Sequence, residues 1–232
     1  MCGIVGQFSF NSTQVEYPSL KKMSDTIAHR GPDGEGFWVN DSQSVGFVHR
    51  RLAIIDLTNT GKQPMLYGDG LSITYNGEIY NYIELKKSLE VKGHKFYTNS
   101  DTEVILVAYL EYGQDCLLHF DGMFSFAIWD ENKKELFAAR DRFGEKPFYY
   151  YLDNNQFVFG SEMKAIFASG VKKKVSDKMI FNYMAYDVIE NSHDKTETFY
   201  EQIFQLQASH SISIDSKGNS KIKKYWDINF KH

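Results

Sequence analysis

Cysteine is scarce in this sequence of 232 residues, which contains only Cys2 and Cys116. Two cysteines cannot build a disulfide framework, so we expect a protein of a reducing compartment, the cytoplasm. No run of eighteen apolar residues occurs, which argues against a helix that spans a membrane. The first residues also lack the charged region and the long apolar segment that make up a secretory signal peptide.

Spacings typical of metal and nucleotide sites are absent as well. The seven histidines show no HxxxH pattern and no CxxC occurs, so we expect no metal site. Gly31, Gly34 and Gly36 lie in a turn-rich stretch without the strand and helix that flank a dinucleotide-binding GxGxxG, and GxxxxGK[ST] does not occur. The formal net charge of −4 argues against a nucleic-acid surface. We therefore expect no metal or organic cofactor in this chain.

Apolar and aromatic side chains, in contrast, are plentiful. Hydrophobic residues make up 42% of the sequence and charged residues 24%, and there are 18 Phe and 15 Tyr. This composition is typical of a globular protein with a sizeable core. The aromatic content favours a fold rich in packed sheet.

Residue patterns along the chain predict strands, then two helices, then strands and helices again. Strands are expected at Gly3–Phe10, Ser44–His49, Leu52–Asp56, Leu71–Tyr75, Met123–Trp129, Glu135–Arg140, Pro147–Tyr151, Gln156–Phe159, His210–Ile214 and Lys221–Trp226. Helices are expected at Leu20–Ile27, Glu78–Lys92, Ser100–Tyr112, Glu162–Phe167 and Asp177–Tyr186. Ser100 and Glu103 have the spacing of a capping box, and Arg30–Gly34 is typical of a turn. The order predicts an α+β fold with two packed sheets covered by helices, in one domain over residues 1–232.

Cys2 is the residue whose position points most directly to chemistry. A thiol is a useful nucleophile only when a base removes its proton or its pKa is low. An N-terminal amine has a pKa of about 7.7–8.0, close to the value of about 8.5 for a free thiol. If Met1 is removed, as is normal before a small residue, Cys2 supplies both the nucleophile and the base. For this position alone, a small apolar residue at the start of a buried strand is the simpler interpretation.

Further motifs around Cys2 change this balance. The segments MCGIVG, HRGPDGEG, HRRLAIIDL, QPM, YNGEIYNYIEL, NSDTEVIL, DGMFSFAIWD, ARDRFGEKPFYYY and GSEMKAI follow one another from residue 1 to about residue 166. In this order they resemble the glutaminase domain of class II glutamine amidotransferases, and specifically that of glutamine-hydrolysing asparagine synthetases. Weaker similarity, in QLQASHSISID and KYWD, continues almost to the end of the chain.

The resemblance implies an N-terminal nucleophile (Ntn) hydrolase fold, a four-layer αββα sandwich of two antiparallel sheets. It also implies hydrolysis of L-glutamine to glutamate and ammonia, with Cys2 as the nucleophile and with Asn76 and Gly77 as the oxyanion hole. Without the resemblance, Asn-Gly is typical of a two-residue hairpin turn, although a helical pattern follows it here. The implied glutamine-binding residues are Arg51, Leu52, Ala53, Ile54, Ile55, Asn76, Gly77, Glu78 and Asp101.

Charge complementarity gives three of these residues a definite expected role. The planar guanidinium of Arg51 suits the substrate's α-carboxylate, which it can bind bidentately. Glu78 and Asp101 would bind the α-ammonium, although Asp101 also favours the dipole of the helix that it begins. Arg30–Gly34 resembles a loop beside the glutamine pocket, which is either a closing loop or an ordinary surface turn. Cys116 is expected to be inert core, and no catalytic role is assigned to the histidines.

The chain also departs from the family pattern. Asparagine synthetases continue into a domain with an SGGxDS loop that binds ATP, and this sequence lacks that loop. ATP and Mg²⁺ would therefore belong to a separate synthetase domain or chain, to which a C-terminal extension beyond about residue 215 would lead. Ala53 and Asn99 replace a common Ser and Gly, from which we expect altered glutamine affinity rather than lost activity. The QLQASH segment lacks the usual prolines, which puts the junction between domains in doubt.

Two other functions remain open from the sequence. The chain could be a non-catalytic glutamine-binding or regulatory module of a synthetase complex, although Cys2 and its expected partners argue against this. It could also be a glutaminase that serves another ammonia acceptor, such as a sugar phosphate. The sequence leaves a homodimer open.

Overall fold

Two antiparallel sheets form the centre of the molecule. The computed structural model describes residues 2–53, 61–68 and 70–228. The first sheet contains, in spatial order, β10 (Phe204–Gln205), β8 (Tyr149–Leu152), β9 (Gln156–Gly160), β1 (Gly3–Ser9), β3 (Val45–Arg51) and β2 (Gly34–Val39). The second contains β12 (Ser220–Lys224), β11 (His210–Asp215), β7 (Glu135–Arg140), β6 (Gly122–Asp130), β5 (Leu71–Ile79) and β4 (Met65–Tyr67).

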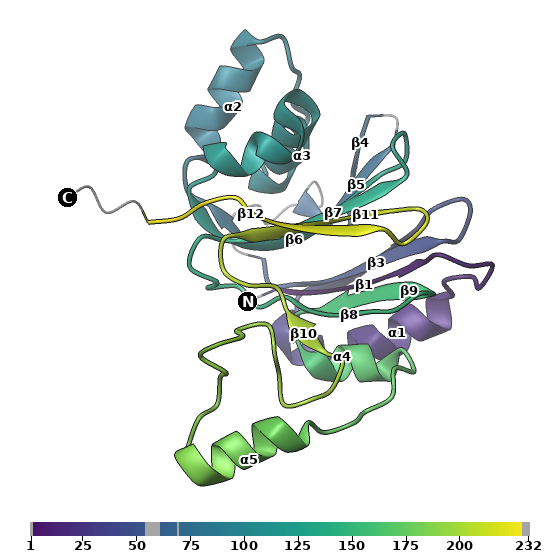
Figure 1. Ribbon diagram of the computed structural model, residues 1–232. Coiled ribbons are helices and arrows are strands. Elements are labelled where there is room, and N and C mark those ends of the chain that lie inside the picture. The colour runs from purple at the N-terminus through teal and green to yellow at the C-terminus, as the bar shows by residue number, and fades with distance from the viewer. Residues whose placement is uncertain (1, 54–60, 69, 229–232) are drawn as a thin grey trace.

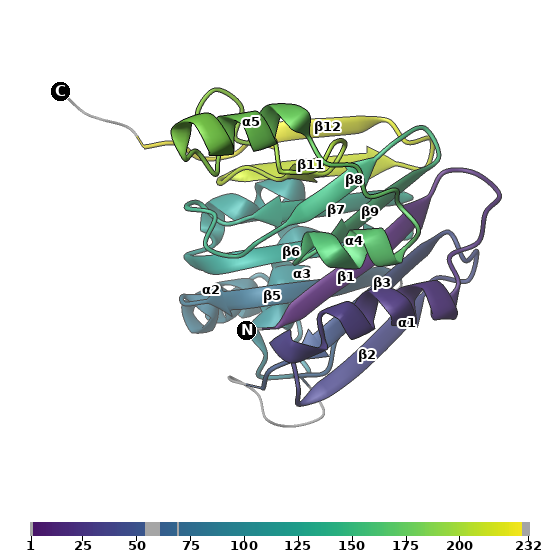
Figure 2. The same cartoon turned by 90° about the horizontal axis from the view of Figure 1, so that it is seen from below.

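Helices cover the outer face of each sheet. The helices of the described chain are α1 (Tyr17–Thr26), α2 (Tyr82–Val91), α3 (Asp101–Tyr112), α4 (Met163–Ala168) and α5 (Asp177–Tyr186), with the 3-10 helices η1 (Ala28–Arg30) and η3 (Gly113–His119). Of these, α5 lies below α4 and away from both sheets (Figure 1). Figure 1 shows α2 and α3 above the second sheet and α1 and α4 below the first. In Figure 2, seen from below, α1 and α4 lie across the first sheet. The predicted α+β fold with αββα layers is therefore confirmed.

Alternation of side chains along the strands produces three apolar layers between these elements. In β1, Ile4 and Phe8 face the second sheet and pack with Trp129, whereas Val5 faces α1 and packs with Leu20. A third cluster fills the space between the second sheet and the helices α2 and α3. The side chains of β1 alternate between two faces, and both faces are buried. The strand therefore has an almost continuous apolar sequence instead of an alternation of apolar and polar residues.

The strand β5 differs from its prediction in a way that matters for the site. It does not stop at Tyr75 but pairs with β6 along its whole length, from Leu71 to Ile79. Asn76 and Gly77 thus lie inside a strand and not in a hairpin turn. The helix expected from Glu78 begins only at Tyr82. Local propensity was overridden here by pairing with a strand that is distant in sequence.

Other boundaries also differ from expectation. The strands β2, β4 and β10 were not predicted, because each is short or follows a turn motif. Of the strand expected at Leu52–Asp56, Leu52 and Ala53 have no strand structure, and the remainder lies outside the described residues. Of the two hydrogen bonds of the predicted capping box, the described structure has only the one accepted by Ser100. Ser100 caps α3 by accepting a hydrogen bond from the Thr102 N–H, but Glu103 accepts from Tyr97 and Thr98.

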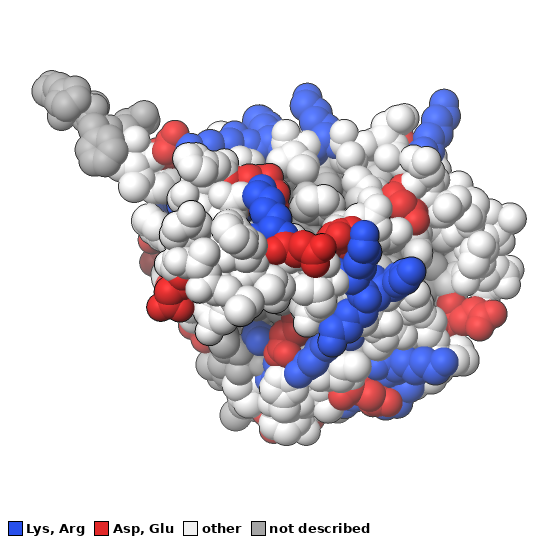
Figure 3. Space-filling model, turned by 60° about the horizontal axis from the view of Figure 1, so that its bottom comes forward, with Lys and Arg blue, Asp and Glu red and all other residues white. Residues whose placement is uncertain are grey.

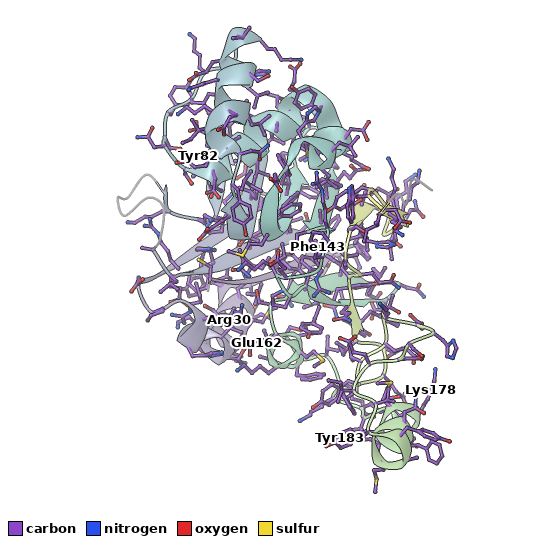
Figure 4. All side chains as sticks on the ribbon, turned by 90° about the vertical axis from the view of Figure 1, so that its left-hand side faces the viewer. Arg30, Tyr82, Phe143, Glu162, Lys178 and Tyr183 are labelled. Atoms are coloured by element: carbon purple, nitrogen blue, oxygen red, sulfur yellow. The ribbon has the colours of Figure 1, made fainter. Side chains whose placement is uncertain are left out.

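The outer surface carries charges of both signs. Figure 3 shows Lys and Arg side chains interspersed with Asp and Glu on one face of the molecule. On α1 and its neighbouring strands, Arg50 contacts both Asp25 and Glu35 at 2.8 Å. On α5, Lys178 pairs with Glu197 at 2.8 Å, and Lys178 and Tyr183 project from this helix in Figure 4. None of the helices in the described part of the chain combines the length and the apolar composition that crossing a membrane requires.

Polar contacts join the two sheets on the side where β3 faces β5. The Thr74 hydroxyl donates to the Val48 carbonyl at 3.0 Å, and His49, only 2% exposed, is hydrogen-bonded to the backbone of Tyr75. Burial lowers the pKa of His49 to about 3, and the bond to Tyr75 opposes this effect only partly. An unfolded histidine has a pKa of about 6.5, so between these two values the unfolded chain binds a proton that the native chain does not. His49 therefore makes the fold less stable as the pH falls from about 6.5 towards 3.

His49→Gln tests this linkage, because glutamine can still donate to the Tyr75 carbonyl but does not titrate. We expect the free energy of unfolding of this variant to depend less on pH between pH 6 and 4, by up to about 1.4 kcal/mol per pH unit. Denaturant unfolding at several pH values measures this. The control Thr74→Val removes the neighbouring inter-sheet hydrogen bond and should lower stability by about 1 kcal/mol at every pH. Equal pH slopes for wild type and His49→Gln would contradict the prediction.

Candidate active site

Cys2 lies directly before β1, whose neighbours β9 and β3 place it at the middle of the first sheet. Its side chain faces the second sheet, because it is two residues before Ile4, which does so. The sulfur meets the peptide groups of Leu52: the Leu52 N–H donates to Sγ at 3.3 Å, and the thiol donates to the Leu52 carbonyl at 3.4 Å. Burial raises the pKa of the Cys2 thiol, while the Leu52 bond and the charges of Arg51 and Arg30 act against this.

Arg30 fixes the backbone at Cys2. Its Nε donates to the Cys2 carbonyl at 3.0 Å, and its Nη1 contacts Glu162 at 3.2 Å. Figure 4 shows Arg30 and Glu162 next to each other, from η1 and the residue that precedes α4. Glu162 also binds His29 and Lys164, at 2.9 and 2.8 Å. The start of β1 is thus held by an ion-pair cluster that links η1 to the beginning of α4.

The open edge of β5 faces Cys2 from the second sheet. The side of β5 away from β6 is covered by β4 only as far as Ile73, so the following N–H groups need other partners. The Tyr75 N–H donates to the Gln63 side chain at 2.7 Å, and the Ile79 N–H donates to Asp101 at 3.1 Å. Alternate N–H groups of a strand point to the same side, so that of Gly77 points to this edge too. It has no acceptor among the described residues.

Glycine is required at position 77 by the neighbouring strand. A Cβ atom there would lie 2.2 Å from the carbonyl oxygen of Met123 in β6. The Asn76 side chain projects to the opposite face from the Tyr75 ring, towards the first sheet. Asn76 is 1% exposed, and its Nδ2 has no hydrogen-bond partner among the described residues. Two donors at adjacent residues, one from the backbone and one from a side chain, therefore have no partner in the described part of the chain.

A pocket of about 60 Å³ lies between Cys2 and this edge. Its described lining residues are Cys2, His49, Arg51, Leu52, Ala53, Gly61, Gln63, Tyr75, Gly77, Glu78, Ser100, Asp101 and Thr102. The structure thus brings together seven of the predicted site residues: Cys2, Arg51, Leu52, Ala53, Gly77, Glu78 and Asp101. Asn76 is not among the described lining residues of the pocket, and the predicted Ile54 and Ile55 lie outside the described residues.

Asp101 and Glu78 give the pocket an acidic side. Asp101 is 4% exposed, and its Oδ2 accepts hydrogen bonds from the Tyr75 hydroxyl at 2.8 Å and from the Ile79 N–H. Burial raises the pKa of Asp101, although both of these bonds favour the charged carboxylate, and the nearby Glu78 raises it further. Asp101 therefore has both roles that its sequence position allows: it begins α3, and its carboxylate lines the pocket.

Arg51 and Ala53, which also line the pocket, are hydrogen-bonded through their backbones to the RGPDG segment at residues 30–34. The Asp33 side chain accepts from the Ala53 N–H at 3.0 Å, and the Asp33 N–H donates to the Arg51 carbonyl at 2.9 Å. Gly31 allows the close approach of this segment to β3, because a Cβ atom there would lie 2.2 Å from the backbone of Arg50. In this conformation the segment is fastened to β3 beside the pocket.

Several pocket residues were missed by the sequence analysis. Gln63, within the QPM motif, contacts both Tyr75 and Thr102, and His49 is a buried wall residue to which no role was assigned. Tyr75, Ser100 and Thr102 also flank predicted residues. These residues lie within motifs that the sequence analysis quoted, but nothing local in the sequence indicates that they line the pocket, because their contacts join segments far apart in the chain. Cys116 is fully buried in the cluster under α3, and burial raises the pKa of its thiol, in agreement with inert core.

Comparison with curated proteins gives relatives that share almost the whole chain. Asparagine synthetase [glutamine-hydrolyzing] 3 of Bacillus subtilis is 39% identical over 233 residues, which cover 98% of this chain and 37% of the relative. Amidase chry2 of Gibberella zeae is 34% identical over 212 residues, covering 91% of this chain and 30% of the relative. The chain thus spans about a third of the length of these relatives.

The described residues contain no cluster of His, Cys, Asp and Glu that could hold a metal ion.

Solved structures share the fold at low sequence identity. The glutamine phosphoribosylpyrophosphate amidotransferase of B. subtilis matches with a TM-score of 0.68 and 20% identity, covering 97% of this chain and 49% of the other. A structure titled as the allosteric regulatory enzyme of purine biosynthesis matches with a TM-score of 0.71 at the same identity and coverage. A family model described as the glutamine amidotransferase domain matches residues 1–226. The chain therefore belongs to the glutamine amidotransferase domain family.

Proposed function

We propose that this chain hydrolyses L-glutamine to glutamate and ammonia, with Cys2 as the nucleophile. The observation that carries the proposal is the placement of the Cys2 thiol and the unpaired Gly77 N–H on the same pocket. Acyl transfer needs a nucleophile and a donor for the oxyanion, and these are the two groups that face each other here. An acidic side and an arginine complete a pocket suited to an α-amino acid.

The first proposed step needs a base, because burial raises the pKa of the Cys2 thiol. Once Met1 is removed, the α-amine of Cys2 takes the thiol proton and the sulfur attacks the carboxamide carbon. The Gly77 N–H and the Asn76 side-chain amide stabilise the oxyanion that forms. The amine then returns the proton to the departing ammonia, and water hydrolyses the γ-glutamyl thioester to glutamate and free thiol. No cofactor enters this sequence.

Recognition of the rest of glutamine follows from the charges around the pocket. Arg51 binds the α-carboxylate, and Glu78 and Asp101 bind the α-ammonium. Leu52 and Ala53 close the pocket on the side of β3, and the same position is proposed for Ile54 and Ile55.

The ammonia is proposed to serve a synthetase of the asparagine synthetase type, as a domain or as a separate chain with an SGGxDS loop. The identity of 39% to an asparagine synthetase over nearly the whole chain supports this acceptor class. The segment after about residue 215 would then lead from the glutaminase domain towards the synthetase. ATP and Mg²⁺ would act there, on the acid that receives the ammonia.

Replacement of the nucleophile is the direct test. We expect Cys2→Ala to lower the rate of glutamine hydrolysis by at least about 10⁴-fold, because no other group can form the thioester. Glutamine binding, measured by calorimetry, should persist in this variant. The matched control Cys116→Ala removes the other, buried thiol and should keep the wild-type rate. Glutaminase activity in Cys2→Ala would refute the assignment.

The state of the N-terminus gives a second prediction. The intact mass of the active protein should correspond to a chain without Met1, and a diazoketone analogue of glutamine should add once, at Cys2. Protein made while methionine aminopeptidase is inhibited should retain Met1 and be inactive, because its Cys2 nitrogen is then a peptide nitrogen and not a base. Full activity of the Met1-containing chain would exclude the proposed proton transfer.

Asp101→Asn tests the binding of the α-ammonium. The amide oxygen can still accept from Tyr75 and Ile79, so only the charge is lost. We expect the KM for glutamine to rise about 10- to 100-fold with little change in kcat. Burial raises the pKa of Asp101, so its carboxylate is protonated at a higher pH than an exposed one. The wild-type KM should therefore increase as the pH falls through the pKa of Asp101, because the neutral acid no longer attracts the α-ammonium, whereas the variant should not show this increase. Glu103→Gln, a buried acid on the same helical turn that does not line the pocket, should keep the wild-type KM. An unchanged KM in Asp101→Asn would remove Asp101 from substrate binding.

A further inference from the structure

Gln63 lies where the second sheet stops being a regular ladder. β4 and β5 pair with Met65 opposite Ile73 and Tyr67 opposite Leu71. The same register, continued by one more step, would bring the backbone of residue 63 opposite Tyr75. The backbone instead turns towards the first sheet. A Cβ atom at Gly36 in β2 would lie only 2.0 Å from the carbonyl oxygen of Gln63, so this approach depends on glycine.

The side chain of Gln63 takes the place of the missing backbone group. Its Oε1 accepts the hydrogen bond from the Tyr75 N–H at 2.7 Å, as a strand carbonyl would do. Its Nε2 donates to the Thr102 hydroxyl in the first turn of α3 at 3.2 Å. A side-chain amide has the same donor and acceptor as a peptide group, so one residue extends the ladder by a single rung and joins it to α3.

The ladder therefore ends one rung before Gly77. Gln63 occupies the Tyr75 N–H and Asp101 occupies the Ile79 N–H, and the Gly77 N–H between them is left for a ligand. Gln63, Gly77 and Asp101 all line the pocket that contains Cys2. We propose that Gln63 is a positioning residue, which holds the β5 edge so that the Gly77 N–H keeps its aim at the oxyanion; this rests on the glutaminase function proposed above.

The expected size of the effect follows from how such donors work. An oxyanion donor stabilises the transition state only if it is already placed where the negative charge develops, and loss of one donor costs about 10²- to 10³-fold in kcat. Without Gln63, the Tyr75 N–H has no partner and the edge from Tyr75 to Gly77 is held on one side only. The Gly77 N–H would then be misplaced but still present. The loss of kcat should therefore be smaller than the loss on removal of a donor, while the binding of glutamine changes little.

Gln63→Met is the test, because methionine has nearly the same shape and neither makes nor accepts these strong bonds. In the full chain we expect kcat for glutamine hydrolysis to fall by about tenfold or more. The dissociation constant of glutamine, measured in a Cys2→Ala background, should change by less than about threefold, because the oxyanion exists only after attack. Gln63→Glu keeps an acceptor for the Tyr75 N–H and should recover most of the lost kcat. The control Lys62→Met changes the exposed neighbouring residue and should keep the wild-type kcat.

Two results would overturn the inference. One is a kcat of Gln63→Met within about twofold of wild type, and the other is a loss of glutamine affinity as large as the loss of kcat, which is the sign of a merely structural role. If wild-type protein does not hydrolyse glutamine at all, the proposed function fails instead. The two failures are therefore distinguishable.

A measurement on the unmodified chain keeps the inference testable even if Gln63→Met does not fold. Hydrogen exchange followed by NMR should show the Tyr75 and Ile79 amides protected and the Gly77 amide exchanging at least about tenfold faster, because of these three only Gly77 has no acceptor among the described residues. Equal protection of the three amides would contradict the proposed arrangement.

Discussion

The open edge of β5 is the constraint on which the rest of the site depends. A strand at the end of its ladder has N–H groups that must find other partners, and here β4 ends at the rung of Ile73. Side chains from two distant segments, Gln63 and Asp101, take the groups at Tyr75 and Ile79. The one group left between them faces Cys2 across the pocket. The chemistry proposed for this chain would thus use an ordinary property of sheet edges, a donor left over from the ladder, at a place where its neighbours are paired.

Packing of the two sheets brings the nucleophile to that edge. The apolar side chains of β1 pack against both the second sheet and α1, so the position of the strand is fixed on both faces. Arg30 and Glu162 hold the backbone at Cys2, and the Leu52 peptide holds its sulfur. For the proposed attack, groups held in this way are preorganised, which is how an enzyme site lowers a barrier. The same burial raises the pKa of the thiol, and this is why the proposal assigns the base to the α-amine.

Much of the fold could be predicted from the sequence. The β-branched and aromatic run of β1, the hairpin pattern of β6 and β7 and the cap at Ser100 are local signals, and the structure has these elements where they were expected. The predicted strand ended too early, at Tyr75, whereas β5 continues to Ile79, and the predicted helix began too early, at Glu78 instead of Tyr82. Pairing with β6 decided both, and no local pattern reports a partner that is more than 40 residues away.

For the site, the sequence was enough to predict the reactive groups: a thiol at position two, an arginine, two acids and an Asn-Gly pair, in an order that resembles one family. Spacing could not tell which of their atoms are free to act. The three-dimensional structure was needed to see that the Gly77 N–H has no acceptor among the described residues, that Asp101 is buried against Tyr75, and that Gln63 and His49 belong to the pocket. The physical reason is that hydrogen-bond pairing and burial depend on segments that meet in space, whereas the identity of a reactive group belongs to its residue alone.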